Sequence, residues 1–107
     1  MVHNFKDFDE IAKLKTPVVI DFWAEWCGPC KLFSPVFEKI EKNKRFEGKV
    51  CFGKVNVDEN DALVEKVGVL NIPCIVFLID GIEVGRSVGF STEEVLSEKI
   101  TEWLKKV

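Results

Sequence analysis

The stretch VVIDFWA, residues 18–24, constrains what this chain can fold into more than any other part of the sequence. Its side chains are apolar on both alternating faces of an extended backbone, and Asp21 is the single exception. Strands of this composition lie in the middle of sheets that helices cover on both faces. The run therefore predicts the central strand of an α/β protein, with one carboxylate buried in it.

Short apolar runs alternate with segments of helical periodicity along the rest of the chain. The Asp80-Gly81 pair favours a hairpin near the end, and Ser91 with Glu94 is typical of a capping box that begins the last helix. The order βαβαβαββα predicts parallel strands joined by right-handed crossovers, followed by an antiparallel hairpin. The predicted strands are 2–5, 18–24, 50–58, 74–80 and 82–89, and the predicted helices are 8–16, 60–68, one beginning at 27 and one running from 91 to the end.

Length and composition indicate a single domain over residues 1–107. A chain of 107 residues with 47% hydrophobic content can bury a core of its own. The N-terminus lacks the basic start and apolar stretch of a signal peptide, and no apolar run reaches membrane-spanning length. The net charge of -3 comes from interspersed acids and bases, without the cationic stripe of nucleic-acid-binding proteins. We expect a cytoplasmic protein that binds neither membranes nor nucleic acid.

The segment EWCGPCK holds the one closely spaced cysteine pair, Cys27 and Cys30. A zinc site would need a second pair or a nearby histidine, but Cys51 and Cys74 lie on separate predicted strands and His3 is far away in the sequence. A structural disulfide over so short a loop would restrict the unfolded chain very little. A redox pair is the interpretation that these residues favour, and we expect no bound metal.

The two cysteines differ in position, and their positions suggest different roles. Cys27 lies where the central strand ends and a helix begins, so unpaired N–H groups and the helix dipole should stabilise its thiolate. We expect it to be exposed and to act as the nucleophile. Cys30 lies one turn further into the helix, where it can attack a mixed disulfide formed at Cys27.

Four segments together resemble the thioredoxin family, namely DFWAEWCGPCK, KVNVDEN, the Ile72-Pro73 pair and VGF at 88–90. They occur in the family's order over nearly the whole chain. The resemblance implies a thioredoxin fold, with a central mixed five-stranded sheet flanked by four helices. It also implies a monomeric thiol–disulfide oxidoreductase of the protein-disulfide reductase kind. Its substrates would be disulfide-containing proteins, and its electrons would come from an external thioredoxin reductase and not from a bound cofactor.

The resemblance also assigns roles to individual residues. Asp21 would lie beneath the active site and help Cys30 to lose its proton, with Lys54 near it. Pro73 would follow a cis peptide bond that places the backbone of Ile72 against the disulfide, where the substrate main chain docks. The flat apolar surface that receives substrates would comprise Trp26, Gly28, Pro29, Ile72, Pro73, Val88, Gly89 and Phe90.

Each of these residues also has a structural interpretation. Burial should raise the pKa of Asp21 and make it a base near neutrality, but a buried aspartate can also serve structure alone. Lys54 could simply be solvated, Trp26 could belong to the core, and X-Pro bonds are usually trans.

Cys74 departs from the family pattern, because thioredoxins usually carry threonine after this proline. A third redox-active thiol is conceivable there, but free cysteine commonly behaves as a small buried hydrophobe. We favour that inert role for both Cys74 and Cys51.

Two other functions stand against a reductase. A related oxidase or isomerase would use the same pair, but Gly28 and Pro29 supply no charge or hydrogen bond that would over-stabilise the Cys27 thiolate. A non-catalytic adaptor would use only the apolar surface to hold a partner. The reduction potential and a Cys27→Ser variant would separate these possibilities.

Overall fold

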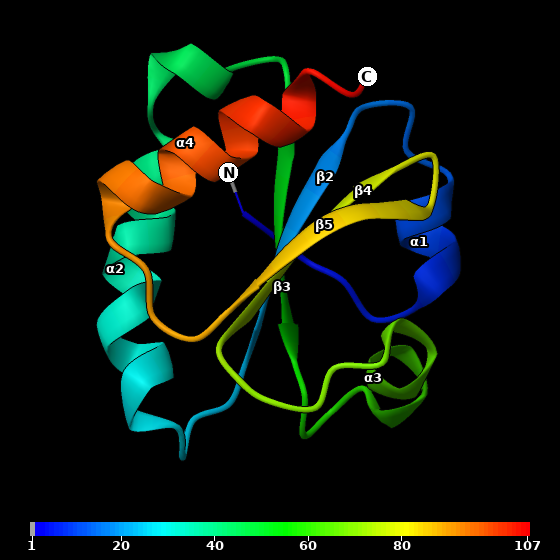
Figure 1. Ribbon diagram of the computed structural model, residues 1–107. Coiled ribbons are helices and arrows are strands. Elements are labelled where there is room, and N and C mark those ends of the chain that lie inside the picture. The colour runs from blue at the N-terminus through cyan, green and yellow to red at the C-terminus, as the bar shows by residue number, and fades with distance from the viewer. Residues whose placement is uncertain (1) are drawn as a thin grey trace.

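The predicted central strand organises the structure, a computed structural model that describes residues 2–107. This strand, β2, lies in the middle of a five-stranded sheet of order β1-β3-β2-β4-β5 (Figure 1). The strands are β1 (His3–Asn4), β2 (Val18–Trp23), β3 (Cys51–Asn56), β4 (Cys74–Ile79) and β5 (Ile82–Val88), and the helices are α1 (Phe8–Ala12), α2 (Gly28–Glu41), α3 (Asp61–Val67) and α4 (Glu93–Leu104).

The strand directions follow the predicted topology. β1 and β2 each pair with β3 in parallel, whereas β4 pairs with both β2 and β5 in antiparallel fashion. The turn between β4 and β5 is the predicted Asp80-Gly81 hairpin, in which both residues have positive φ. The mixed sheet and its four helices confirm the predicted fold, to which the structure adds a short 3₁₀ helix at Lys44–Phe46.

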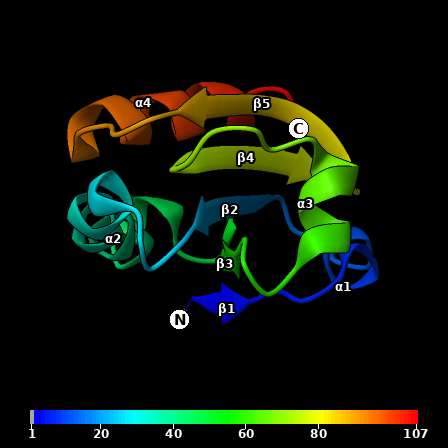
Figure 2. The ribbon, with the colours of Figure 1, turned by 90° about the horizontal axis from the view of Figure 1, so that it is seen from below.

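Helices cover both faces of the sheet, as the composition of β2 requires. Figure 2 shows α2 and α4 on one side of the stacked strands and α1 and α3 on the other. Val19 belongs to the cluster of buried side chains on the α2 and α4 side, together with Phe37 and Ile100. Its neighbours Val18 and Ile20 belong to the cluster on the α1 and α3 side. Alternation along one strand thus places hydrophobic side chains in both cores.

Local signals fix most helix ends. Asp7 and Glu10 form the predicted capping box of α1, and Gly68 ends α3 in the left-handed conformation. The predicted Ser91 cap of α4 is wrong, because Thr92 is the N-cap and its hydroxyl accepts from the N–H of Val95 at 3.2 Å. Among residues 2–107 no helix has the length and apolar character needed to cross a membrane.

Ser91 is instead buried, with its hydroxyl 3.4 Å from that of Ser87 on β5. Two adjacent hydroxyl residues precede the helix, and the path of the chain from β5 decides which of them becomes the cap.

Strands β1 and β3 are also shorter than their apolar runs suggested, because pairing with a neighbour and not composition sets the ends of a strand.

Candidate active site

The cysteine pair lies at the junction of β2 and α2. Cys27 is the N-cap residue of α2, and its sulfur accepts a hydrogen bond from the backbone N–H of Cys30 at 3.2 Å. The two residues form a disulfide, with their Cα atoms 5.3 Å apart. Pro29 is in the first turn of the helix, where its missing N–H costs no hydrogen bond. The predicted position of Cys27 at a helix N-terminus is confirmed.

Neither cysteine is exposed in this disulfide-bonded state, and the exposure of Cys27 in the reduced protein stays a prediction. Cys27 is 5% exposed and Cys30 is 2% exposed, so both sulfurs are largely covered. Trp23, Ala24 and Ile72 pack around them. Position on the helix, rather than exposure, distinguishes the two cysteines here.

Two backbone segments meet beside the disulfide. The carbonyl oxygen of Ile72 lies 3.9 Å from the Cys27 sulfur, and the Ile72–Pro73 peptide bond is cis, as the resemblance implied. The carbonyl of Pro73 accepts from the N–H of Gly89 at 2.7 Å. The segments 72–73 and 88–90, which are distant in sequence, therefore lie next to each other at the active site.

An apolar surface surrounds the disulfide. Trp26 is 70% exposed, and Val88 and Phe90 are each more than half exposed. The ring of Phe90 meets the buried ring of Phe33 edge-to-face, with centroids 6.1 Å apart. Exposure of several large apolar side chains in one area is a common property of interaction surfaces.

The other residues predicted for this surface differ in burial. Gly28 and Pro29 are exposed, whereas Ile72 and Gly89 are partly buried. Pro73 is buried, so it can contribute to the surface only through its neighbours. Trp26 is held in place by a hydrogen bond from its Nε1 to Asp58 Oδ2 at 2.9 Å, a partner that the sequence did not reveal.

Asp21 is buried in the middle of β2, with 1% of its surface exposed. Neither carboxylate oxygen has a hydrogen-bond partner among residues 2–107. Burial raises the pKa of Asp21 from 3.8 to about 7, although the positive charge of Lys54 acts in the opposite direction. An unpaired carboxylate with a pKa in this range can exchange a proton near neutrality.

Lys54 lies directly opposite Asp21 in the pairing of β2 with β3. Its ammonium group donates to the hydroxyl of Ser34 at 2.6 Å and stands 5.6 Å from the ring centroid of Trp23. The side chains of Lys54, Ser34 and Trp23 line a cleft of about 360 Å³, together with Cys30. Ser34 belongs to this arrangement and was not predicted, since a serine inside an amphipathic helix gives no distinguishing signal.

Comparison with known proteins agrees with this geometry. The thioredoxin family model matches residues 1–102. The chain is 42% identical to Bacillus subtilis (strain 168) thioredoxin over 87 residues, which is 81% of this chain and 82% of that protein. It is 40% identical to Staphylococcus aureus (strain Mu50 / ATCC 700699) thioredoxin over 99 residues, 92% of this chain and 91% of that protein. The chain belongs to the thioredoxin family.

A solved structure gives the same result for the fold. The crystal structure of the Malassezia sympodialis thioredoxin Mala s 13 superposes with a TM-score of 0.87 and 37% sequence identity. The match covers 97% of this chain and 91% of that one. With the Cys27–Cys30 disulfide at a helix N-terminus, these relatives identify the thioredoxin-family chain as a thiol–disulfide oxidoreductase. Family membership also implies disulfide-containing substrates and a reductase that returns the pair to the dithiol.

The two remaining cysteines of this thioredoxin-family chain are unbonded. Cys74 is buried and Cys51 is partly buried, and burial raises the pKa of both thiols. A raised pKa lowers the thiolate fraction near neutrality, and the thiolate is the reactive form. Their environment therefore fits the inert role that the sequence favoured.

Proposed function

We propose that this chain is a protein-disulfide reductase in which Cys27 is the nucleophile and Cys30 the resolving thiol. The observation that carries the proposal is the position of Cys27 at the N-cap of α2, where the helix dipole favours a thiolate. The dithiol form is the reactant. Its Cys27 thiolate attacks one sulfur of a substrate disulfide, forms a mixed disulfide and releases the first substrate thiolate.

The second step returns the protein to its disulfide form. The Cys30 thiolate attacks the Cys27 sulfur of the mixed disulfide, and the second substrate sulfur leaves as a thiolate that takes up a proton. Two electrons and two protons pass in total from the Cys27–Cys30 dithiol to the substrate disulfide. No group other than these two thiols has to carry electrons, so we propose that no cofactor is bound and that an external thioredoxin reductase supplies the electrons.

Asp21 is proposed as the base that accepts the proton of Cys30. Its burial, its unpaired oxygens and its pKa of about 7 support this role, because a base is most effective when its pKa is near the working pH. Lys54, opposite Asp21, would stabilise the carboxylate once it forms.

Protein substrates are proposed to dock on the apolar surface around the disulfide. Trp26, Val88 and Phe90 offer exposed apolar contacts. The carbonyl of Ile72, close to Cys27, is placed to accept a hydrogen bond from substrate backbone. Gly28, Pro29 and Gly89 complete the proposed surface, to which the buried Pro73 contributes only through its neighbours.

We also propose that the protein acts as a monomer in the cytoplasm. The unpaired Cys51 and Cys74 are compatible with that compartment, where reductants keep thiols reduced. Sedimentation at micromolar concentration and fractionation of the producing cells would test the two points separately.

The decisive experiment follows the dithiothreitol-driven reduction of a disulfide-linked protein, with and without this chain. We expect wild type to accelerate the reaction and Cys27→Ser to abolish the acceleration. A measured reduction potential close to the thioredoxin value of about -270 mV would support a reductase, and one near -120 mV would indicate an oxidase instead. Wild type that binds protein disulfides without accelerating their reduction would leave only an adaptor function.

A further inference from the structure

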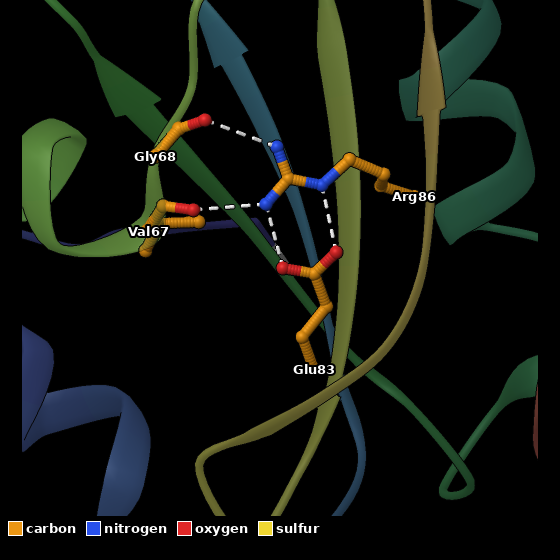
Figure 3. Close-up of polar contacts among 4 residues, drawn as sticks. All are labelled: Val67, Gly68, Glu83 and Arg86. Carbon is orange, nitrogen blue, oxygen red and sulfur yellow. Dashed lines mark hydrogen bonds and ion pairs between the residues drawn. The ribbon is translucent and has the colours of Figure 1, made fainter.

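Arg86 on β5 makes four hydrogen bonds with one planar guanidinium group (Figure 3). Its Nε and Nη2 donate to the two carboxylate oxygens of Glu83 at 2.7 and 2.6 Å. Its Nη2 also donates to the carbonyl of Val67 at 2.8 Å, and its Nη1 to the carbonyl of Gly68 at 3.2 Å. The side chain is 30% exposed, so it lies largely against the protein. One residue thus joins β5 to the end of α3.

The carbonyls that Arg86 binds are groups that a helix leaves unpaired. The last carbonyls of an α-helix lack partners within the helix, and a cation near them also interacts favourably with the helix dipole. Val67 is the last residue of α3, and Gly68 is its C-cap. The bidentate pairing with Glu83 fixes the plane of the guanidinium group and raises the pKa of Arg86, so the group remains charged.

The segment that follows α3 leads directly to the disulfide. Residues 69–72 form no regular structure, and the side chain of Leu70 is 91% exposed. This segment ends at Ile72, whose carbonyl lies 3.9 Å from the Cys27 sulfur. At the start of the segment Val69 is buried and its N–H donates to the carbonyl of Val64 at 3.2 Å, so the segment begins fixed to the end of α3 that Arg86 binds.

Arg86 also lies close to the second segment of the apolar surface. It precedes Val88 by two residues on β5, and the N–H of Gly89 donates to the carbonyl of Pro73 at 2.7 Å. The guanidinium group and this backbone hydrogen bond connect the same two segments at opposite ends. Residues 68–73 are therefore bonded to β5 at their first residue, through Arg86, and to Gly89 at their last residue, through Pro73.

We propose that Arg86, oriented by Glu83, is a positioning residue that holds residues 69–72 in place for docking of protein substrates. An exposed ion pair contributes little stability by itself, so what matters is the two carbonyls that the pair fixes. The proposal rests on the proposed reductase function, because it assigns Arg86 to the docking step of that reaction. Arg86 touches neither sulfur and is not expected to affect the thiol chemistry itself.

The test compares wild type with Arg86→Gln in four measurements. Amide hydrogen exchange at Gly68 and Val69, whose N–H groups donate to the Val64 carbonyl at 2.9 and 3.2 Å, should become roughly tenfold faster in the variant, because the charged hydrogen bonds that hold the end of α3 are lost. KM for a disulfide-linked protein should rise about three- to tenfold with little change in kcat, as expected when a docking contact is lost. The rate with a small aromatic disulfide, which has no main chain to dock, and the reduction potential should both stay within about twofold of wild type.

Two further variants separate this proposal from a general loss of stability. Lys105→Gln disrupts another i,i+3 ion pair, the one that Lys105 forms with Glu102 on α4. That pair is more exposed than the Arg86–Glu83 pair, and its loss should change none of the four readouts. Glu83→Gln leaves Arg86 in place and should change exchange and KM in the same direction, but less. It remains a test of the proposal if Arg86→Gln does not fold.

Two results would overturn the proposal. Unchanged exchange and KM in Arg86→Gln would show that residues 69–72 hold themselves in place. An equal loss of rate with the protein and the small disulfide would show that Arg86 acts on the fold or the sulfurs. An inactive wild type would refute the reductase function instead, and the exchange measurement, which needs no activity, would still decide whether Arg86 holds the segment.

Discussion

Asp21 is the residue whose chemistry departs most from its surroundings. A folded pKa of about 7 in place of 3.8 means that the native state binds the proton more tightly than the unfolded chain. Below the unfolded pKa the group is neutral in both states, and no stability is lost. As pH rises from about 4 to about 7, ionisation increasingly favours the unfolded chain, and above the folded pKa the cost levels off on the order of 4 kcal/mol.

We therefore expect Asp21→Asn to stabilise the oxidised protein at neutral and higher pH, by up to a few kcal/mol, and to change its stability little near pH 3. The same variant should reduce protein disulfides about tenfold more slowly, because the base proposed for Cys30 is gone. Denaturant melts at acid and neutral pH, set beside turnover, measure both effects. A variant that is less stable at neutral pH yet fully active would leave Asp21 a purely structural role.

The two active-site cysteines should differ in reactivity. In the reduced protein near neutral pH, brief alkylation should modify Cys27 and spare Cys30. Cys27 is the N-cap and its sulfur accepts an N–H, whereas Cys30 lies inside the helix. Peptide mapping after brief labelling measures the ratio. Dominant modification of Cys30 would reverse the roles assigned to the two thiols.

At the scale of elements, the start of α4 depends on Thr92. Its hydroxyl satisfies the N–H of Val95, so Thr92→Ala should cost about 1 kcal/mol of stability. Ser91→Ala loses only a weak contact at 3.4 Å and should cost less. Chemical denaturation of the two variants compares them directly, and a larger cost at Ser91 would mean that the helix begins one residue earlier.

Strand order keeps Cys51 and Cys74 apart. β2 lies between their strands, with Cys51 opposite Val18 at one end of β2 and Cys74 opposite Phe22 near the other. Two strand spacings alone amount to roughly 9 to 10 Å between backbones, beyond the limit of about 7 Å between the Cα atoms of a disulfide. Digestion under non-reducing conditions should yield no peptide that joins the two cysteines. Recovery of such a peptide would contradict the strand order.

At the scale of the whole molecule, the contact between β5 and α4 depends on a glycine. A Cβ at Gly85 would overlap the indole ring of Trp103, so the helix can lie this close only because no side chain is present. We expect Gly85→Ala to cost about 1 to 3 kcal/mol, as overpacking in a core does.

Trp103→Ala provides the control, because it removes the five-membered ring of the indole that the new methyl group would meet. In a double-mutant cycle the second change should recover part of the loss caused by Gly85→Ala. Purely additive effects, measured by denaturant melts, would show that the close approach of Gly85 to Trp103 does not limit the packing.

The sequence alone determined the order of the elements, the central strand and the nature of the cysteine pair. Apart from Asp21, Val18–Trp23 is apolar on both faces, which predicts a covered strand, and Cys27 follows where this strand gives way to α2. These are local properties, since the pattern that indicates them lies within a few neighbouring residues. The buried carboxylate at Asp21 could be predicted for the same reason.

Only the tertiary structure decided how side chains from different elements meet. Lys54 donates to Ser34, 20 residues away in sequence, Trp26 to Asp58 over 32 residues, and Arg86 to Val67 over 19. It also decided that Cys27 is covered in the disulfide state and that Thr92, not Ser91, caps α4. Each of these depends on the distance and angle between elements, which packing of the two cores sets and no local pattern of residues specifies.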